Sequence, residues 1–376
     1  MAQGFSLKDQ LFNADSIGDL AGEFAILPGF DAARFHAAVM AGLAPRELLA
    51  RLDWIADCLE PYLAPDFATM ADQLEACMPP PLDPGLQDDD FGRFIHAVPG
   101  ILAVRHGLEN HRERALDLLY EATKRFSMEF YIRPFLNRWP AETMARLTAW
   151  AEDQNYHVRR LVSEGTRPKL PWAAKLATDP MMPLPLLDRL HADPTRYVTR
   201  SVANHLNDLA KIDPSVVIGR LEAWQNEGRQ ASKELDWMTR HALRTLVKNG
   251  HPDALRMLGY RDDLEMIAGI TIMPGPVRIG DAVEFTGSVQ TQEPANVLID
   301  YVLHLHRPTG RAGRKVFKLK QGRTQAGRPL ALRKKHLLKG NATTFTLHPG
   351  PHRIELQVNG RIVAEATFDL QAAPAR

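Results

Sequence analysis

The sequence predicts a mostly helical protein in which an α-solenoid of the HEAT or armadillo kind is followed by a small all-β sandwich. Arg160, Arg200 and Arg240 recur every 40 residues, each within a helix-like stretch. A repeat of that length with two helices per copy is typical of α-solenoids. In the last third of the chain the apolar residues alternate with period two, which is typical of β-strands. We therefore expect a helical domain at residues 1–261 and a β-domain at residues 262–376.

The first part of the chain predicts helices that end at a proline-rich loop. Apolar residues between Met40 and Leu59 recur at helical spacing. The segment from Met78 to Gly85 contains four prolines, which remove the backbone donors that a helix needs. Further prolines recur between short helix-like runs as far as about residue 258. This punctuation is typical of helical repeats that are joined by short connections.

The repeat predicts which side chains are buried and which share a surface. Three copies are expected, spanning residues 147–165, 187–214 and 221–252. Three equivalent apolar positions are expected in the core: Val162, Val202 and Ala242. Three equivalent polar positions are expected on the concave face that a solenoid presents to its ligand: Glu164, Asn204 and Arg244. This face is where the sequence predicts function.

The β-domain is predicted by several short alternating runs after residue 262 and by a tight turn near the end of the chain. Asn359-Gly360 lies between two alternating segments, where positive φ is easily adopted, and it predicts a β-hairpin. Several such strands within about 110 residues are typical of a small β-sandwich.

The composition is that of an ordinary soluble globular protein, with 45% hydrophobic and 24% charged residues among 376. No run reaches the roughly 18 apolar residues that a membrane span needs, and the N-terminus lacks the pattern of a signal peptide. Cys58 and Cys77 have no histidine pattern nearby, so we expect two reduced thiols and no metal site. No organic cofactor is expected either.

A dense basic block stands out against a net charge of only +1. Residues 307–339 contain twelve lysines and arginines and no acid, so the rest of the chain is net acidic. Such a block faces a polyanion or forms a solvated tail. Leucines and other apolar residues are interleaved with the charges, which argues against a plain tail. The block consists of Arg307, Arg311, Arg314, Lys315, Lys318, Lys320, Arg323, Arg328, Arg333, Lys334, Lys335 and Lys339.

The concave face combines cations with two carboxylates. Glu164 lies among Arg159, Arg160, Arg167, Lys169 and Lys175, and Asp208 lies near Asn204 and is flanked by Arg196, Arg200 and Lys211. The cations suit a phosphate-binding surface. A carboxylate there is costly unless it faces a positive charge, such as an alkylated base or an oxocarbenium-like sugar. The alternative is that both acids only form surface ion pairs with the neighbouring arginines.

Three segments carry a family resemblance, at residues 125–136, 157–173 and 201–211. The second contains Ser163-Glu164-Gly165, Arg167-Pro168, and Leu170-Pro171-Trp172. Together with Phe12-Asn13 and residues 48–59, these segments closely resemble the HEAT-repeat DNA glycosylases of the alkylation-repair family, in particular the AlkC branch. The resemblance covers roughly residues 5–260. The β-domain resembles the immunoglobulin-like (Ig-like) extension that some members carry.

The resemblance implies a monofunctional DNA glycosylase that excises cationic N-alkylated bases, chiefly 3-methyladenine and also 3-methylcytosine. It implies bent double-stranded alkylated DNA held on the concave face, without the deep pocket of base-flipping enzymes. It further implies a monomer in the bacterial cytoplasm, associated with the nucleoid when bound to DNA. The sister AlkD branch has a tryptophan at the position that we align with Asn204. A non-catalytic HEAT scaffold that binds DNA structures or a protein partner is the alternative function.

The resemblance implies site residues as well. The catalytic candidates are Glu129, expected on a helix ahead of the first copy, together with Glu164 and Asp208; one of them stabilises the oxocarbenium and orients or deprotonates water. Glu121 competes with them, or forms a surface pair with Arg125. The expected DNA-binding residues are Arg159, Arg160, Arg167, Lys169, Trp172, Lys175, Arg200, Asn204, Lys211, Lys318, Lys320, Arg333, Lys334 and Lys335.

Some of these positions have a structural alternative. Trp172 is a wedge or stacking residue, or it belongs to the core. Asp153, Tyr156 and His157 cap the following helix or contact phosphate. The β-domain clamps DNA with its basic block, or it only stabilises the last repeat.

Overall fold

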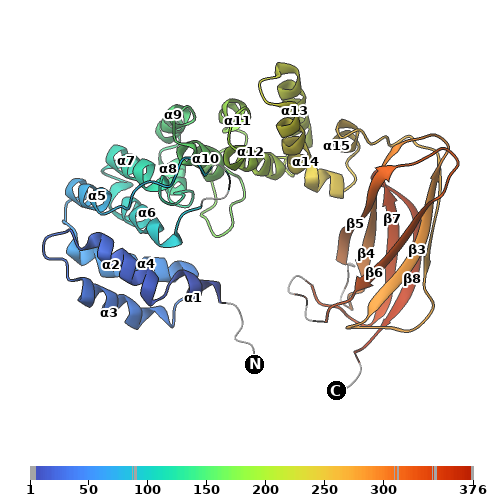
Figure 1. Ribbon diagram of the computed structural model, residues 1–376, viewed down its shortest axis with the longest axis horizontal. Helices are drawn as coiled ribbons and strands as arrows, with labels where there is room; N and C mark the ends of the chain where they lie inside the picture. The colour runs from blue at the N-terminus through green and yellow to red at the C-terminus, as the bar shows by residue number, and fades with distance from the viewer. Residues whose placement is uncertain are drawn as a thin grey trace. The chain divides into compact units, whose positions relative to one another are not determined.

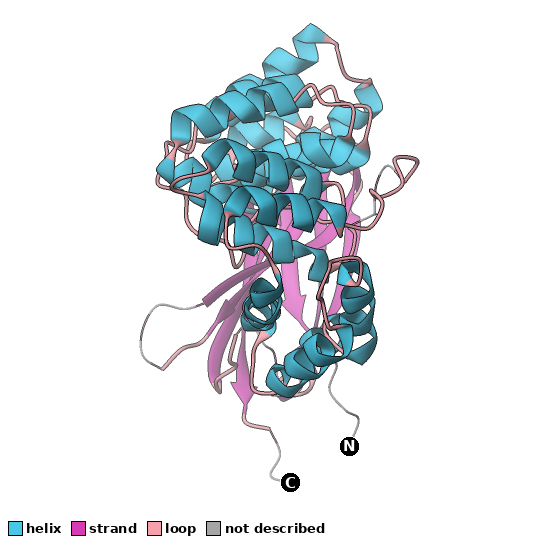
Figure 2. Ribbon diagram, turned by 90° about the vertical axis from the view of Figure 1, so that its left-hand side faces the viewer, coloured by secondary structure: helices cyan, strands magenta, loops and turns pink. Residues whose placement is uncertain are grey.

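The computed structural model describes residues 6–86, 88, 91–308, 310, 313–340, 342 and 345–373. Its contacts divide the chain into two compact units, Met1–Ile212 with Leu221–Ala242, and Asp213–Arg220 with Leu243–Arg376. Within the part of the chain that is described, no helix is both long enough and apolar enough to span a membrane. The predicted combination of helical and all-β parts is confirmed (Figures 1 and 2).

The helical part is built from short helices, several of which begin at the prolines that punctuate the sequence. Pro140 and Pro252 occupy the first turns of their helices, where the missing N–H has no partner to lose. The helices are α1 (Leu7–Leu11), α2 (Ala14–Phe24), α3 (Ala32–Leu43), α4 (Leu48–Leu59), η1 (Glu60–Tyr62), α5 (Phe67–Ala76), η2 (Phe94–Ala97), α6 (Val98–Leu102), η3 (Ala103–Gly107), α7 (Arg112–Thr123), α8 (Ile132–Arg138), α9 (Pro140–Trp150), α10 (Tyr156–Gly165), α11 (Leu184–Leu190), α12 (Arg196–Leu209), α13 (Pro214–Glu227), α14 (Ser232–Lys248) and α15 (Pro252–Met257).

Each predicted repeat corresponds to a pair of helices: α9 with α10, α11 with α12, and α13 with α14. Figure 1 shows α9 and α11 on one side and α10 and α12 on the other. Val162, Val202 and Ala242 are fully buried, as the repeat predicted. Two boundaries were wrong: the first helices of the first and third copies begin at Pro140 and Pro214 rather than near residues 147 and 221. The reason is that each of these prolines starts a helix, since a proline is tolerated in the first turn.

Helix α10 shows how the sequence positions functional side chains. The side chain of Asn155 accepts a hydrogen bond from the backbone N–H of His157 and so caps the helix N-terminus. Val158, Leu161 and Val162 are fully buried, at spacings that place them on one face. α10 and α12 pack directly against each other. Their polar residues therefore come together along the seam between the two helices.

The β-part is a two-layered sandwich (Figure 2). The three-stranded sheet has the order β1-β3-β6 and the five-stranded sheet has the order β2-β8-β7-β4-β5. The predicted hairpin at Asn359-Gly360 is confirmed, since it joins β7 and β8 and both residues have positive φ. The strands are β1 (Met266–Ile272), β2 (Val277–Arg278), β3 (Ala282–Thr291), β4 (Asn296–Leu305), β5 (Gly313–Arg323), β6 (Leu330–Leu337), β7 (Gly350–Val358) and β8 (Arg361–Gln371).

The end of the helical part packs with the strands. Leu255 and Tyr260 are buried against Leu298 of β4. Gly250 approaches Gly360 so closely that a side chain at either position would collide with the other's backbone. α15 thus belongs to the same compact unit as the sandwich. The functional domain boundary between residues 261 and 262 stays a prediction.

Candidate active site

The three candidate carboxylates come from three different elements of the first unit. Glu164 is on α10, Asp208 is on α12, and Glu129 lies in the turn that precedes α8. The expectation that Glu129 is on a helix was wrong. Phe126 forms a β-bridge with Gly92, and this extended backbone separates α7 from α8. The turn places Glu129 opposite α10.

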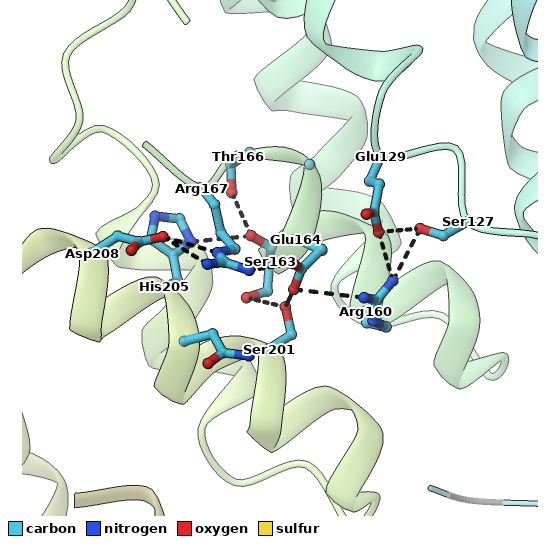
Figure 3. Close-up of polar contacts among 12 residues, drawn as sticks. Ser127, Glu129, Arg160, Ser163, Glu164, Thr166, Arg167, Ser201, His205 and Asp208 are labelled. Carbon is cyan, nitrogen blue, oxygen red and sulfur yellow. Dashed lines mark hydrogen bonds and ion pairs between the residues drawn. The ribbon is translucent and has the colours of Figure 1, made fainter. Parts of the chain in front are cut away.

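Arg160 joins two of these carboxylates (Figure 3). One guanidinium nitrogen of Arg160 donates to Oε2 of Glu129 at 2.8 Å, and the other lies 3.7 Å from Oε2 of Glu164. The hydroxyl of Ser127 also donates to Glu129, at 2.9 Å. Arg160 in addition lies over the ring of Tyr197, 4.6 Å from its centroid. The guanidinium of Arg160 therefore contacts carboxylates through its nitrogens and the ring of Tyr197 through its face.

Arg167 and Lys211 extend the series to the third carboxylate. Arg167 donates to Oε1 of Glu164 at 2.5 Å and to Oδ2 of Asp208 at 2.8 Å. Lys211 donates to Oδ1 of Asp208 at 3.0 Å. Acids and cations thus alternate along one line, which we call the ion chain. It consists of Glu129, Arg160, Glu164, Arg167, Asp208 and Lys211.

The middle of the ion chain is buried, and this sets its ionisation. Burial raises the pKa of Glu164, but the guanidinium groups of Arg160 and Arg167 and a 2.6 Å hydrogen bond from Ser201 outweigh burial, so that its pKa is lowered. Glu164 is therefore ionised at neutral pH. His205 lies beside these residues, and its Nδ1 is 3.0 Å from the carbonyl oxygen of Ser163. Burial lowers the pKa of His205 to about 4.

The three carboxylates differ in solvent exposure. The side chain of Glu129 is 17% exposed, compared with 6% for Glu164 and 5% for Asp208. Both oxygens of Glu164 and both of Asp208 accept hydrogen bonds. Among the described residues, only one oxygen of Glu129 has a hydrogen-bond donor. Glu129 is thus the carboxylate with room for a water molecule.

Several predicted DNA-binding cations already have intramolecular partners. Arg159 pairs with Asp193 at 2.5 Å and also donates to two backbone carbonyls, and Arg200 pairs with Asp88. Asn204 lies 2.8 Å from Nε2 of His241. Phosphate binding by these residues stays a prediction, and it requires their present contacts to open or to be shared.

Lys169, Trp172 and Lys175 lie in the connection between α10 and α11. Trp172 is 67% exposed, so the alternative that it belongs to the core was wrong. Its φ of 65° is in the left-handed region, which costs a bulky residue about 1–3 kcal/mol. An exposed aromatic ring on strained backbone is typical of a functional position.

Two further structural alternatives concern Glu121 and Asp153. Glu121 pairs with Lys124 and Arg125 on α7, which confirms its interpretation as a surface ion pair. Asp153 accepts hydrogen bonds from the backbone of Asn155 and from Tyr120, so it orders the turn before α10. The cap itself is Asn155, which the sequence interpretation missed.

The basic block of the β-part is divided between two edge strands. Lys318 and Lys320 are exposed on β5, at the edge of the five-stranded sheet. Arg333 and Lys335 are exposed on β6, at the edge of the three-stranded sheet, and Lys334 is half-buried on the opposite face of that strand. The two strands follow each other in the chain, so the block borders one side of the sandwich. Arg311 lies outside the described residues.

Sequence reasoning missed Ser127, Ser201 and His205. Ser127 lies two positions before Glu129, and this short spacing could have indicated a contact between the two side chains. Ser201 reaches Glu164 from the neighbouring helix, and no spacing in the sequence indicates that contact. Among the residues that the structure describes, no group of three or more histidines, cysteines or acids could hold a metal ion.

Comparisons with known proteins agree with this architecture. Residues 266–372 match the family described as "Uncharacterised protein YhaZ, C-terminal Ig-like domain". YhaZ of Bacillus subtilis (strain 168) is 32% identical over 289 residues, which cover 75% of this chain and 79% of YhaZ. The structure of the alkylpurine DNA glycosylase AlkC of Pseudomonas fluorescens, bound to DNA containing an abasic site analog, matches with a TM-score of 0.84 and 31% identity. That match covers 96% of this chain and 99% of AlkC. The chain therefore belongs to the protein family of YhaZ and AlkC.

Proposed function

We propose that the protein is a monofunctional DNA glycosylase that hydrolyses the N-glycosidic bond of cationic N-alkylated bases in duplex DNA. 3-Methyladenine is the principal expected substrate, with 3-methylcytosine as a second. The similarity to AlkC over nearly the whole chain supports the reaction class. The observation that carries the proposal is the partly open carboxylate of Glu129 at the end of the ion chain.

The chemistry needs little acid catalysis. In an N-alkylated cation the base already carries a positive charge, and it leaves with the electron pair of the glycosidic bond as a neutral molecule. The sugar passes through an oxocarbenium-like state that a nearby carboxylate stabilises. Water then attacks C1′ and loses a proton. We assign the orientation and deprotonation of this water to Glu129, because its second oxygen has no donor among the described residues.

Glu164 and Asp208 have a different role in this proposal. Each is buried and accepts hydrogen bonds on both oxygens, so neither has room for water without breaking an ion pair. They hold Arg160 and Arg167 and neutralise their charge. Arg160 in turn orients Glu129. The ion chain thus positions one reactive carboxylate without leaving an excess of positive charge beside the oxocarbenium.

Contacts to the DNA backbone are proposed at exposed cations. Lys169 and Lys175 flank Trp172 in the α10–α11 connection, and no ion pair of theirs is present among the described residues. In the Ig-like domain, Lys320 and Lys335 likewise have no carboxylate partner there, whereas Arg333 pairs with Glu284 at 2.5 Å. We propose that these residues neutralise phosphates. That the protein acts as a monomer at the bacterial nucleoid stays a prediction.

The alternative function is a HEAT scaffold that binds DNA without catalysis. A panel of duplexes, each with one N-methylated base, separates the two functions. A glycosylase releases the free base and leaves an abasic site that alkali cleaves. A scaffold binds the same duplexes and leaves every base attached. Release of 3-methyladenine supports the proposal, and binding without release of any base contradicts it.

A further inference from the structure

The connection between α10 and α11 differs from the other connections of the repeats. It runs over residues 166–183, whereas the turns within and between neighbouring helix pairs occupy only 151–155, 191–195, 210–213 and 228–231. Loops of this length inside compact helical domains are uncommon, and those that persist are typically functional. This connection also carries Trp172, which is exposed and has a left-handed backbone.

A single buried arginine joins the start of this loop to a point just beyond Trp172. Arg133 of α8 is 1% exposed, and its guanidinium donates to three backbone carbonyls. The acceptors are Gly165 at 3.0 Å and Arg167 at 2.8 Å, where the loop begins, and Ala174 at 2.5 Å, beyond Trp172. A planar guanidinium with several fixed donors makes these three contacts at once, which a lysine ammonium with its single centre does not reproduce.

Two further features of the sequence support this arrangement. Asn137 lies one helical turn after Arg133; its amide donates to the carbonyl of Lys175 at 2.9 Å and accepts from the N–H of Ala177 at 2.8 Å. Gly165 ends α10 so close to Ile132 that an added Cβ would lie 2.5 Å from the isoleucine side chain. The absence of a side chain at Gly165 therefore lets the helix end reach Arg133.

No carboxylate is hydrogen-bonded to Arg133 among the described residues. Burying an arginine against carbonyls, without an opposite charge, has a large desolvation free energy, which the ordering of a surface loop alone does not explain. The same contacts fix the start of the loop at Arg167, which is part of the ion chain. Arg133 therefore links the position of the exposed ring to the geometry of the carboxylates.

We propose that Arg133 is a positioning residue that holds residues 166–177 in one conformation, so that Trp172 is presented to the DNA beside the ion chain. Asn137 assists it through its contacts with Lys175 and Ala177. The catalytic part of this inference rests on the proposed glycosylase function, whereas the ordering of the loop does not. Trp172 is thus a fixed element, and the loop is not a flexible cover that orders only when DNA binds.

The test compares Arg133→Lys with Arg138→Lys, a control on the same helix whose side chain is exposed and pairs with Glu109. Hydrogen exchange of peptides from residues 166–177 is measured in the free protein. We expect exchange at least tenfold faster in Arg133→Lys and unchanged in Arg138→Lys. Asn137→Ala is measured as well, and it should also speed exchange in residues 166–177. If Arg133→Lys does not fold, Asn137→Ala is compared with Arg138→Lys in its place. The proposal is overturned if Arg133→Lys and Asn137→Ala, where they fold, exchange as slowly as the wild type.

A second arm tests the link to Trp172. In single-turnover release of 3-methyladenine, we expect Arg133→Lys to slow the chemical step at least tenfold, with the Kd for DNA changed less than threefold. In a Trp172→Ala background the same substitution should slow the reaction less than it does in the wild type. Equal slowing in both backgrounds overturns the assignment to Trp172. If the wild type releases no base, the proposed function fails, and hydrogen exchange still decides the ordering of the loop.

Discussion

The guanidinium of Arg160 lies 2.8 Å from Oε2 of Glu129 and bridges the turn before α8 to helix α10. This contact orients a carboxylate that lies outside any helix. Ser127 donates to the same oxygen, so the other oxygen of Glu129 has no hydrogen-bond donor among the described residues. The catalytic proposal depends on this difference between the two oxygens.

Replacing Glu129 with glutamine should lower base release without unfolding the protein. The amide of the new side chain could still accept a hydrogen bond from Arg160, but it can neither deprotonate water nor stabilise the oxocarbenium as an anion. We expect a loss of at least about 100-fold in the single-turnover rate, as is typical when a general base is removed. The matched control is Glu121→Gln, which alters a surface ion pair on α7 and should leave the rate unchanged. Equal rates for wild type and Glu129→Gln would remove Glu129 from the mechanism.

Replacing Glu164 with glutamine should affect stability as well as activity. Glu164 is buried between Arg160 and Arg167, and removing its charge leaves both arginines with fewer compensating anions. Breaking a buried ion pair typically costs about 3–5 kcal/mol. Chemical denaturation should therefore show a lower free energy of unfolding for Glu164→Gln than for Glu129→Gln. The reverse order would contradict the assignment of Glu164 to the support of the site.

The periodic parts of the fold could be foreseen from the sequence. The spacing of Arg160, Arg200 and Arg240 predicted the helix pairs, because one repeat of a solenoid determines the next. The alternation of polar and apolar residues predicted the strands for the same reason. Periodicity could not predict that Glu129 lies in a turn, because the bridge between Phe126 and Gly92 joins distant parts of the chain.

The contacts of the site were harder to foresee than its residues. The sequence indicated acids among cations, but not which cation joins which acid, since Arg167 reaches Asp208 of α12 from the connection that follows α10. The exposure of Trp172 was undecided, because a Pro-Trp-Ala segment suits a core as well as a loop. The basic block appeared as one feature, yet the chain reverses between β5 and β6 and divides it between two sheets.

Binding of DNA should depend on salt through the exposed cations of the Ig-like domain. Neutralising Lys318, Lys320, Arg333, Lys334 and Lys335 together should flatten the plot of log binding constant against log salt concentration, since each phosphate contact contributes a slope of about 0.9. Among single variants, Lys320→Ala and Lys335→Ala should each reduce the slope by about 1.

Arg333→Ala should reduce the slope less than these two variants, because Arg333 already pairs with Glu284. The measurement is a salt titration of binding to an unmodified duplex. Arg34→Ala, which removes an exposed cation of α3, serves as the control and should leave the slope as it is. A slope that is unchanged in the fivefold variant would show that the block does not contact phosphate.

Stability should fall in mild acid in part because of His205. Its pKa is about 4 in the folded protein, below the ordinary value of 6.5, because burial disfavours the charged ring. The unfolded chain therefore binds a proton at a higher pH than the folded chain does. The contribution of His205 is fully present above about pH 6.5 and is lost as the pH falls toward 4, by about 3 kcal/mol at most.

His205→Asn isolates this contribution, because asparagine can still donate to the carbonyl of Ser163 but does not titrate. The free energy of unfolding of this variant should depend less steeply on pH between about 6.5 and 4 than that of the wild type. Identical slopes for His205→Asn and the wild type would show that His205 takes up its proton equally in both states.

The most direct test of the central claim is a single-turnover reaction of the wild-type protein with a duplex that contains one 3-methyladenine. Free base is separated from DNA by chromatography, and abasic sites are counted by alkaline cleavage of the same samples. We predict that one base is released for each abasic site formed, at a rate well above that of spontaneous loss. Tight binding of the duplex with base loss no faster than in protein-free DNA would contradict the account.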